Sequence, residues 1–195
     1  MGNTIESCKE DVKNMKILLN RYDAKIKICI DCHTLNEVIN MKKSFEPHIN
    51  DLLIIFYAGH GKMLGKKINN KMEIISTWVN NDNSLTHSDK IDNILSLINC
   101  NKILISDSCH SGNFSNFYKG DSPFLFIGSS SIVSLSNEYI IFHNKKTGVL
   151  VSLFEYLLVE KSFSDLTLSD FTKKTITFFN HNKIKVKPIV KIYNI

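Results

Sequence analysis

The fold of this chain follows from one segment, DLLIIFYAGHG at residues 51–61. It opens with a continuous run of Leu, Ile, Phe and Tyr without polar alternation, which is typical of a strand buried on both faces of a parallel sheet. KILISDS at 102–108 and PFLFIGSS at 123–130 repeat the pattern, each an apolar run followed by small polar residues. We therefore predict that the three segments are strands of one parallel sheet.

The segments between and beyond these strands carry apolar residues at helical spacing. Three such stripes are Val12, Met15, Leu18 and Leu19; Ile91, Ile94, Leu95 and Ile98; and Val151, Phe154, Leu157 and Leu158. Thr86 or Ser88 is the expected N-cap of the second helix. Two further strands are predicted at 25–30 and 186–193. Strands that alternate with helices predict an α/β fold, with a mostly parallel sheet between helices on both faces.

Composition and length favour one compact domain over residues 1–195. Its apolar runs are far shorter than the roughly 18 residues of a membrane helix, so we expect no membrane partner. The net charge is +5, but the lysines are spread along the chain, and no nucleic-acid partner is expected. Five cysteines without an apolar leader predict thiols in a reducing, cytoplasmic location.

The candidate chemistry lies where two of the strands end. His60 stands between two glycines after the first strand, and Cys109 lies in DSCHSG after the second. Parallel strands bring their carboxyl ends to one edge of the sheet, so we expect the imidazole and the thiol to meet there. A thiol is mostly protonated at neutral pH, and a nearby imidazole would accept its proton. The backbone N–H groups of Gly61 and Cys109 are predicted to form an oxyanion hole.

Each residue also has a purely structural interpretation. Cys109 would be a small buried apolar side chain and His60 an ordinary turn residue. The arrangement of both at strand ends favours the Cys/His pair. His110, directly after Cys109, is badly placed to reach its sulfur.

The two strand-end motifs, YAGHG and DSCHSG, resemble those of the caspase-like cysteine peptidases, and in particular of the metacaspases. SCKEDVKNMKILL at 7–19 is similar to the family segment with Cys-x-x-Asp before its first helix. GVLVSLFEYLL at 148–158 and the strand near the C-terminus resemble the small-subunit end of the fold. The resemblance implies a large-subunit-like part over about 1–118 and a small-subunit-like part over about 122–195.

The resemblance implies roles for individual residues. Cys109 would be the nucleophile and His60 the general base and acid. Asp11 and Asp107 would form acidic walls of the S1 pocket, with Cys8 and Ala58 also in S1, and would select Lys or Arg at P1. The structural alternatives are a strand-end cap for Asp107 and a first-turn acid for Asp11.

Three departures from the metacaspase pattern stand out. The family normally has a strand before the Cys-x-x-Asp segment, and here only MGNTIES comes before Cys8; either this sequence begins late or the sheet closes differently. Ala58 stands where the family usually has a serine that lines S1. Calcium-binding acids are replaced by Glu73, His87, Ser88 and Asn116, a list that predicts weak or absent calcium dependence and no required cofactor.

Other sequence patterns give weaker evidence for a function. CIDCH at 29–33 has the spacing of a haem attachment site, and Cys29, Cys32 and His33 could bind zinc, but no export signal or second ligand pair accompanies them. GHGKMLGKK at 59–67 lacks the spacing of a phosphate-binding loop and is interpreted as a flexible loop. Self-cleavage is a hypothesis for loops at Lys119, Lys145 or Lys146.

The sequence thus predicts a monomeric cysteine endopeptidase of metacaspase type that acts on peptide or protein substrates with a basic P1 residue. The alternative is a catalytically silent caspase-like adaptor or decoy that binds a protein partner. The missing strand and Ala58 favour the alternative, whereas the presence of both His60 and Cys109 opposes it.

Overall fold

The computed structural model describes residues 5–22, 25–28, 34–44, 47–131, 140–142, 145–158, 168–184 and 188–194. Its main sheet has the order β1-β5-β6-β9. The strands are Leu52–Ala58, Asn101–Asp107, Phe124–Gly128 and Ile189–Tyr193. β1, β5 and β6 are parallel, as predicted, and β9 pairs with β6 in the antiparallel direction.

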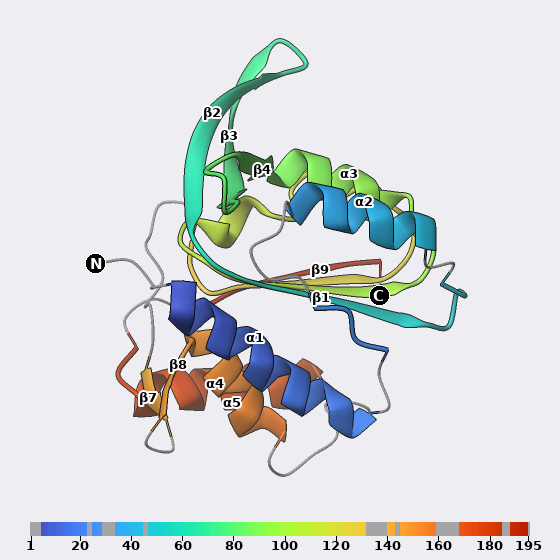
Figure 1. Cartoon of the computed structure of the whole chain (residues 1–195). Helices are drawn as coiled ribbons and strands as arrows, with labels where there is room; N and C mark the ends of the chain where they lie inside the picture. The colour runs from blue at the N-terminus through green and yellow to red at the C-terminus, as the bar shows by residue number, and fades with distance from the viewer. Residues whose placement is uncertain are drawn as a thin grey trace.

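Helices cover both faces of this sheet (Figure 1). α2 and α3 lie on one face, and α1, α4 and α5 lie on the other. Their bounds are Ile5–Leu19 for α1, Thr34–Ser44 for α2, Ser88–Ser96 for α3, Val149–Leu158 for α4 and Leu168–His181 for α5; 3-10 turns span Asn20–Tyr22 and Ser111–Asn113. The predicted α/β architecture is confirmed. None of the helices in the described ranges is long and apolar enough to cross a membrane.

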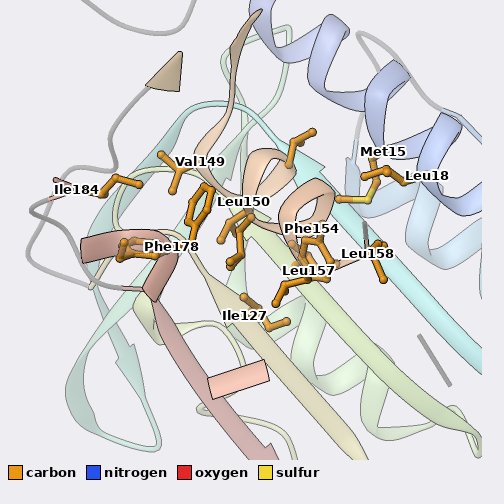
Figure 2. Packing of buried hydrophobic residues seen from close by; sticks show 14 residues of the cluster. Met15, Leu18, Ile127, Val149, Leu150, Phe154, Leu157, Leu158, Phe178 and Ile184 are labelled. Carbon is orange, nitrogen blue, oxygen red and sulfur yellow. The ribbon is translucent and has the colours of Figure 1, made fainter. Parts of the chain in front are cut away.

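The larger core lies between the sheet and the helices α1, α4 and α5. Figure 2 shows Met15 and Leu18 of α1 near the α4 side chains Leu150, Phe154 and Leu157. All five are at most 4% exposed. Burial of each such side chain is worth about 1.5–3 kcal/mol, so the helical stripes expected from the sequence anchor this layer to the sheet.

A second, antiparallel sheet follows directly after His60. It contains β2 (Gly61–Ile68), β3 (Lys71–Val79) and β4 (Leu85–His87). The prediction of a flexible loop here was wrong. Asn69 and Asn70 both adopt positive φ angles, 49° and 65°, which suits the tight two-residue turn of a hairpin. Half of the β2 residues are exposed and none is buried, so the strand has no buried apolar stripe for the sequence to reveal.

Trp78 joins the second sheet to the main one. It is fully buried, its ring stacks on Tyr57 of β1 at a centroid distance of 4.4 Å, and it also stacks on Phe114. Its indole N–H donates a hydrogen bond of 2.8 Å to Ser106 Oγ on β5. A buried indole N–H needs such a partner, and the bond sets the root of the hairpin against β5.

Several local expectations were wrong. Residues 25–28 have no strand, and the rest of that predicted strand, with the CIDCH segment, lies outside the described residues. The α3 N-cap is His87, without a side-chain cap, because Thr86 bonds to Asn80 instead. Lys145–Thr147 form β8, which pairs with β7 (Ile140–Phe142), so Lys145 and Lys146 are in a strand and not in a loop.

β1 is less buried than its apolar sequence suggests. Six of its seven residues are half-buried and Leu52 is exposed. Among the described residues β1 has a strand neighbour on one side only, β5, and stands at one end of the order. Residues 1–4, ahead of α1, lie outside the described ranges.

Candidate active site

His60 and Cys109 follow adjacent strands at the same end of the main sheet. β1 and β5 are paired in register up to Ala58 opposite Asp107, and the Gly59 N–H extends the pairing by donating to the Asp107 carbonyl at 3.2 Å. Each candidate residue lies two positions beyond its last paired residue. The two turns therefore lie next to each other, with His60 exposed and Cys109 half-buried.

Gly61 is where the two turns touch. A methyl group on this residue would lie 1.9 Å from the Cys109 carbonyl oxygen and 3.0 Å from its carbonyl carbon. No side chain can occupy that space unless the backbone moves. Glycine therefore allows the backbone after His60 to pack directly on the backbone of Cys109.

The backbone of His60 is held by two neighbours while its side chain stays exposed. Its carbonyl accepts the Val79 N–H at 2.9 Å and the Tyr57 hydroxyl at 3.0 Å. The Tyr57 ring is itself fixed by stacking on Trp78. The backbone of His60 is thus fixed from within the core, and its side chain is exposed.

Ser76 of β3 holds the turn that follows Cys109. Its hydroxyl, fully buried, donates to the carbonyl of His110 and accepts the Asn113 N–H at 3.0 Å. His110 has a φ of 55°, a left-handed conformation that is costly for a residue with a side chain. Such a conformation persists where surrounding contacts hold it, and Ser76 supplies two of them.

Serines that follow β6 hold the turn from the other side. The hydroxyls of Ser129 and Ser130 donate to the carbonyl of Ser108 at 3.2 and 3.0 Å. Ser130 Oγ also accepts the Ser111 N–H at 3.3 Å. Ser108 and Ser111, which flank Cys109 and His110, are therefore both bonded to the buried Ser130 hydroxyl, and this restrains the turn that carries Cys109.

Asp11 and Asp107, far apart in the sequence, come together at Gly148. The Gly148 N–H donates to Asp11 Oδ1 at 2.7 Å, and the Leu150 N–H, in the first turn of α4, donates to Asp107 Oδ2 at 3.1 Å. A methyl group on Gly148 would lie 2.7 Å from Asp11 Oδ2 and 2.6 Å from Asp107 Oδ2. Both side chains are buried, so two carboxyls lie beside a single glycine.

Burial dominates the electrostatics of this acidic pair. Desolvation raises the pKa of Asp11 to about 7, opposed by the Gly148 N–H and reinforced by the charge of Asp107. Desolvation likewise raises the pKa of Asp107 to about 6, against the Leu150 N–H and the Ser129 hydroxyl. Near neutral pH the pair therefore carries less than two full negative charges. A cation placed beside the two carboxyls would stabilise their charged form.

Cys8 and Ala58 flank the acidic pair. Desolvation, then the charges of Asp11 and Asp107, raise the pKa of the Cys8 thiol to about 11, so Cys8 is a neutral thiol beside the carboxyls. Ala58 is the last residue of β1 and pairs with Asp107 across the ladder. The predicted S1 residues thus converge from α1, β1 and β5.

The positions expected to replace calcium ligands form no cation site. Asp89, next to His87 and Ser88, already pairs with the Lys66 ammonium at 2.7 Å, and His87 Nδ1 lies 3.2 Å from the same ammonium. In the described ranges no group of three or more His, Cys, Asp or Glu side chains has the geometry to hold a metal ion. These residues do not fit calcium, and we derive no step through a metal.

Sequence reasoning missed Tyr57, Ser76 and Gly148. Tyr57 and Gly148 carry no signal of their own in the sequence, since their roles depend on contacts with other elements. Ser76 lies in a strand that was not predicted. Ser129 and Ser130 could have been found, because they follow a predicted parallel strand at the same edge as Cys109.

Comparisons with known proteins concern the family and the fold of the chain. The family model described as "Caspase domain" matches residues 1–182. A crystal structure of a Geobacter sulfurreducens protein has a TM-score of 0.70 over 97% of this chain and 84% of that chain, at 14% sequence identity, a level that indicates a shared fold. No curated protein matches the sequence significantly.

Proposed function

Because this chain belongs to the caspase domain family, whose members are cysteine peptidases, we propose that it is a cysteine endopeptidase of metacaspase type that cleaves after Lys or Arg. The observation that supports this most is the contact of the His60 and Cys109 turns at Gly61, with a buried acidic pair adjoining Cys109 through Asp107.

The proposed reaction proceeds through a thioester. His60 accepts the thiol proton of Cys109, and the thiolate attacks the carbonyl carbon of the scissile bond. Backbone N–H groups of Gly61 and Cys109 stabilise the negative oxygen. His60 then protonates the leaving amine as the C–N bond breaks. A water molecule, deprotonated by His60, hydrolyses the thioester and regenerates the thiol.

Specificity is assigned to the acidic pair. Each carboxyl accepts one backbone hydrogen bond, from Gly148 or from Leu150, and a carboxylate can accept more than one donor. A guanidinium or ammonium at P1 would supply the opposite charge that buried carboxylates lack. Ala58 contributes no hydrogen bond, so recognition of P1 depends on Asp11 and Asp107.

A panel of fluorogenic peptides that end in Arg, Lys, Asp or Asn tests the assignment. Cleavage is expected after Arg and Lys only. The Asp107→Asn variant should lower kcat/KM for the Arg peptide by about 100-fold, since a buried charged hydrogen bond is worth roughly 2–3 kcal/mol. Asp121→Asn, which changes an exposed carboxyl in the loop before β6, is the matched control. Turnover of the Asp peptide alone would remove the S1 assignment, and turnover of the Asn peptide alone would indicate a legumain-like specificity.

Activity and stability should respond to pH in opposite directions. On acidification from pH of about 7.5 to 5.5, kcat/KM for the Arg peptide should fall, because the pKa values of Asp11 and Asp107, about 7 and about 6, place protonation of the pair in this range. Folding raises both pKa values, so the pair's contribution to the free energy of unfolding is larger at low pH and declines as pH rises.

The measurement compares wild type with Asp107→Asn. Acidification should raise the melting temperature of the wild type more than that of the variant. Alkylation of Cys109 by iodoacetamide, which carries no P1 group, separates titration of the nucleophile from titration of the pair. An Arg-peptide kcat/KM that increases on acidification would contradict the assignment.

No metal is assigned to the reaction, and EGTA is expected to leave kcat/KM unchanged. A reducing, cytoplasmic location suits the thiol chemistry, and the three described cysteines, Cys8, Cys100 and Cys109, are free thiols.

A further inference from the structure

The hairpin of β2 and β3 has one face that begins at the active site. Because β2 and β3 pair without a bulge, residues opposite each other share a face. Gly61 opposite Trp78 starts this face, and Met63 opposite Ser76 continues it. Gly65 opposite Ile74 and Lys67 opposite Met72 lie further out. The Met72 methyl group lies 3.2 Å from the space above Gly65, which places the two on the same face.

The turn that carries Cys109 and His110 packs on the root of this face. Gly61 packs on the Cys109 carbonyl, and Ser76 bonds to His110 and Asn113. The Asn113 amide also donates to the Ile74 carbonyl. Any chain that leaves the active site along the hairpin must therefore pass over the residues that come next on the same face.

Those next residues are apolar and exposed. Met63 is 46% exposed, Ile74 54% and Met72 71%, and we call these three residues the hairpin stripe. Figure 1 shows the hairpin reaching well beyond α2 and α3. Large apolar side chains gathered on one face of a projecting element are typical of a binding surface.

The charges on the hairpin indicate which kind of segment it could bind. Lys67, directly across from Met72, is an exposed cation on the face of the stripe, whereas Lys71, at the tip, belongs to the opposite face. Glu73 stands across from Lys66, which also pairs with Asp89 at 2.7 Å. The outer end of the stripe therefore presents positive charge and complements an acidic residue.

The direction of the peptide follows from the two sides of the active site. Asp11 and Gly148 lie with α1 and α4 on one side of the main sheet, whereas the hairpin stands with α2 and α3 on the other (Figure 1). When the acidic pair binds the P1 side chain, the scissile bond is positioned at Cys109. The substrate residues that follow the scissile bond can then extend along the hairpin.

We propose that the hairpin stripe binds the substrate segment that follows the cleaved bond, and that it selects apolar residues there with an acidic residue beyond them. This inference rests on the proposed peptidase function. The four residue steps from Met63 to Lys67, which lies opposite Met72, span about 13 Å, which matches an extended segment of about four residues.

The test uses two peptides that are identical up to an Arg at P1. One continues with Ile-Leu-Ile-Asp and the other with Ser-Gly-Ser-Asn, and cleavage is followed by mass spectrometry. We expect wild-type kcat/KM to be about tenfold higher for the first peptide, the scale on which apolar pockets discriminate. The double variant Ile74→Ser with Met72→Ser should reduce the ratio to within about twofold. A third peptide, which continues with Ile-Leu-Ile-Lys, should be cleaved less efficiently by the wild type than the Ile-Leu-Ile-Asp peptide, and Lys67→Glu should reverse that order.

Ile176→Ser, which changes an equally exposed apolar residue on α5, is the control and should keep the wild-type ratio. A short arginyl aminocoumarin amide, which has no residues beyond the cleaved bond, reports whether each variant keeps an assembled site. Equal kcat/KM for the two peptides in an enzyme that cleaves the short amide would overturn this inference alone. Failure to cleave any Arg or Lys substrate would overturn the peptidase function together with it.

Discussion

Replacement of Cys109 by Ala is expected to lower kcat/KM for an arginyl peptide by roughly 10⁴-fold or more, because loss of the nucleophile removes the covalent route entirely. His60→Ala should be nearly as severe, since the two residues act as one unit. Affinity of the Cys109→Ala protein for the same peptide, measured by fluorescence anisotropy, should stay close to that of the wild type. The S1 carboxyls are untouched by the change.

Cys100→Ala is the matched control, since Cys100 is a fully buried thiol that adjoins β5 at its opposite end. Labelling with an arginyl chloromethyl ketone, located by mass spectrometry, should place one adduct on Cys109. Retained hydrolysis in Cys109→Ala would remove the mechanism. Peptide binding without any adduct or turnover on the folded wild-type protein would favour the adaptor or decoy.

Gly61→Ala is expected to reduce kcat by about 10²–10³-fold, the cost of losing an oxyanion-hole donor. The added methyl group would lie 1.9 Å from the Cys109 carbonyl oxygen, so one of the two turns must move. Such a movement displaces both the imidazole and the backbone N–H groups from the scissile carbonyl. Single-turnover kinetics with the short arginyl amide measures the effect on the chemical step.

Gly65→Ala, four residues along the same strand, is the comparison. Its added methyl group would meet only the Met72 methyl, at 3.2 Å, and that flexible side chain can rotate away. Circular dichroism and thermal unfolding should show both variants folded. A Gly61→Ala enzyme with wild-type kcat would mean that the contact with Cys109 has no role in catalysis.

Much of the main sheet could be predicted from the sequence, because its evidence is local. Strands β1, β5 and β6 each contain an unbroken apolar run, and helical stripes such as Met15 with Leu18 repeat at a regular spacing. A parallel sheet carries its strand ends to one edge, so placing His60 near Cys109 needed only the order of the strands.

The hairpin was missed for an equally local reason. Its two strands expose Met63, Met72 and Ile74 together with several lysines, so they lack the alternation that identifies a half-buried strand. Trp78 stabilises the hairpin by packing on Tyr57 and Phe114, which are distant in the sequence. The N-cap of α3 was also predicted wrongly: His87 occupies that position, and the Thr86 hydroxyl bonds to Asn80.

The candidate nucleophile and base can be recognised in the chain of residues alone, because glycine-flanked His60 and Cys109 follow buried strands. The contacts that hold these two residues in place cannot be recognised in this way. The hold of Ser76 on His110, the packing of Gly61 on Cys109 and the meeting of Asp11 with Asp107 at Gly148 each join segments that are 34 or more residues apart. Such contacts depend on how twisted sheets and helices pack in space, a property that no short pattern of residues encodes.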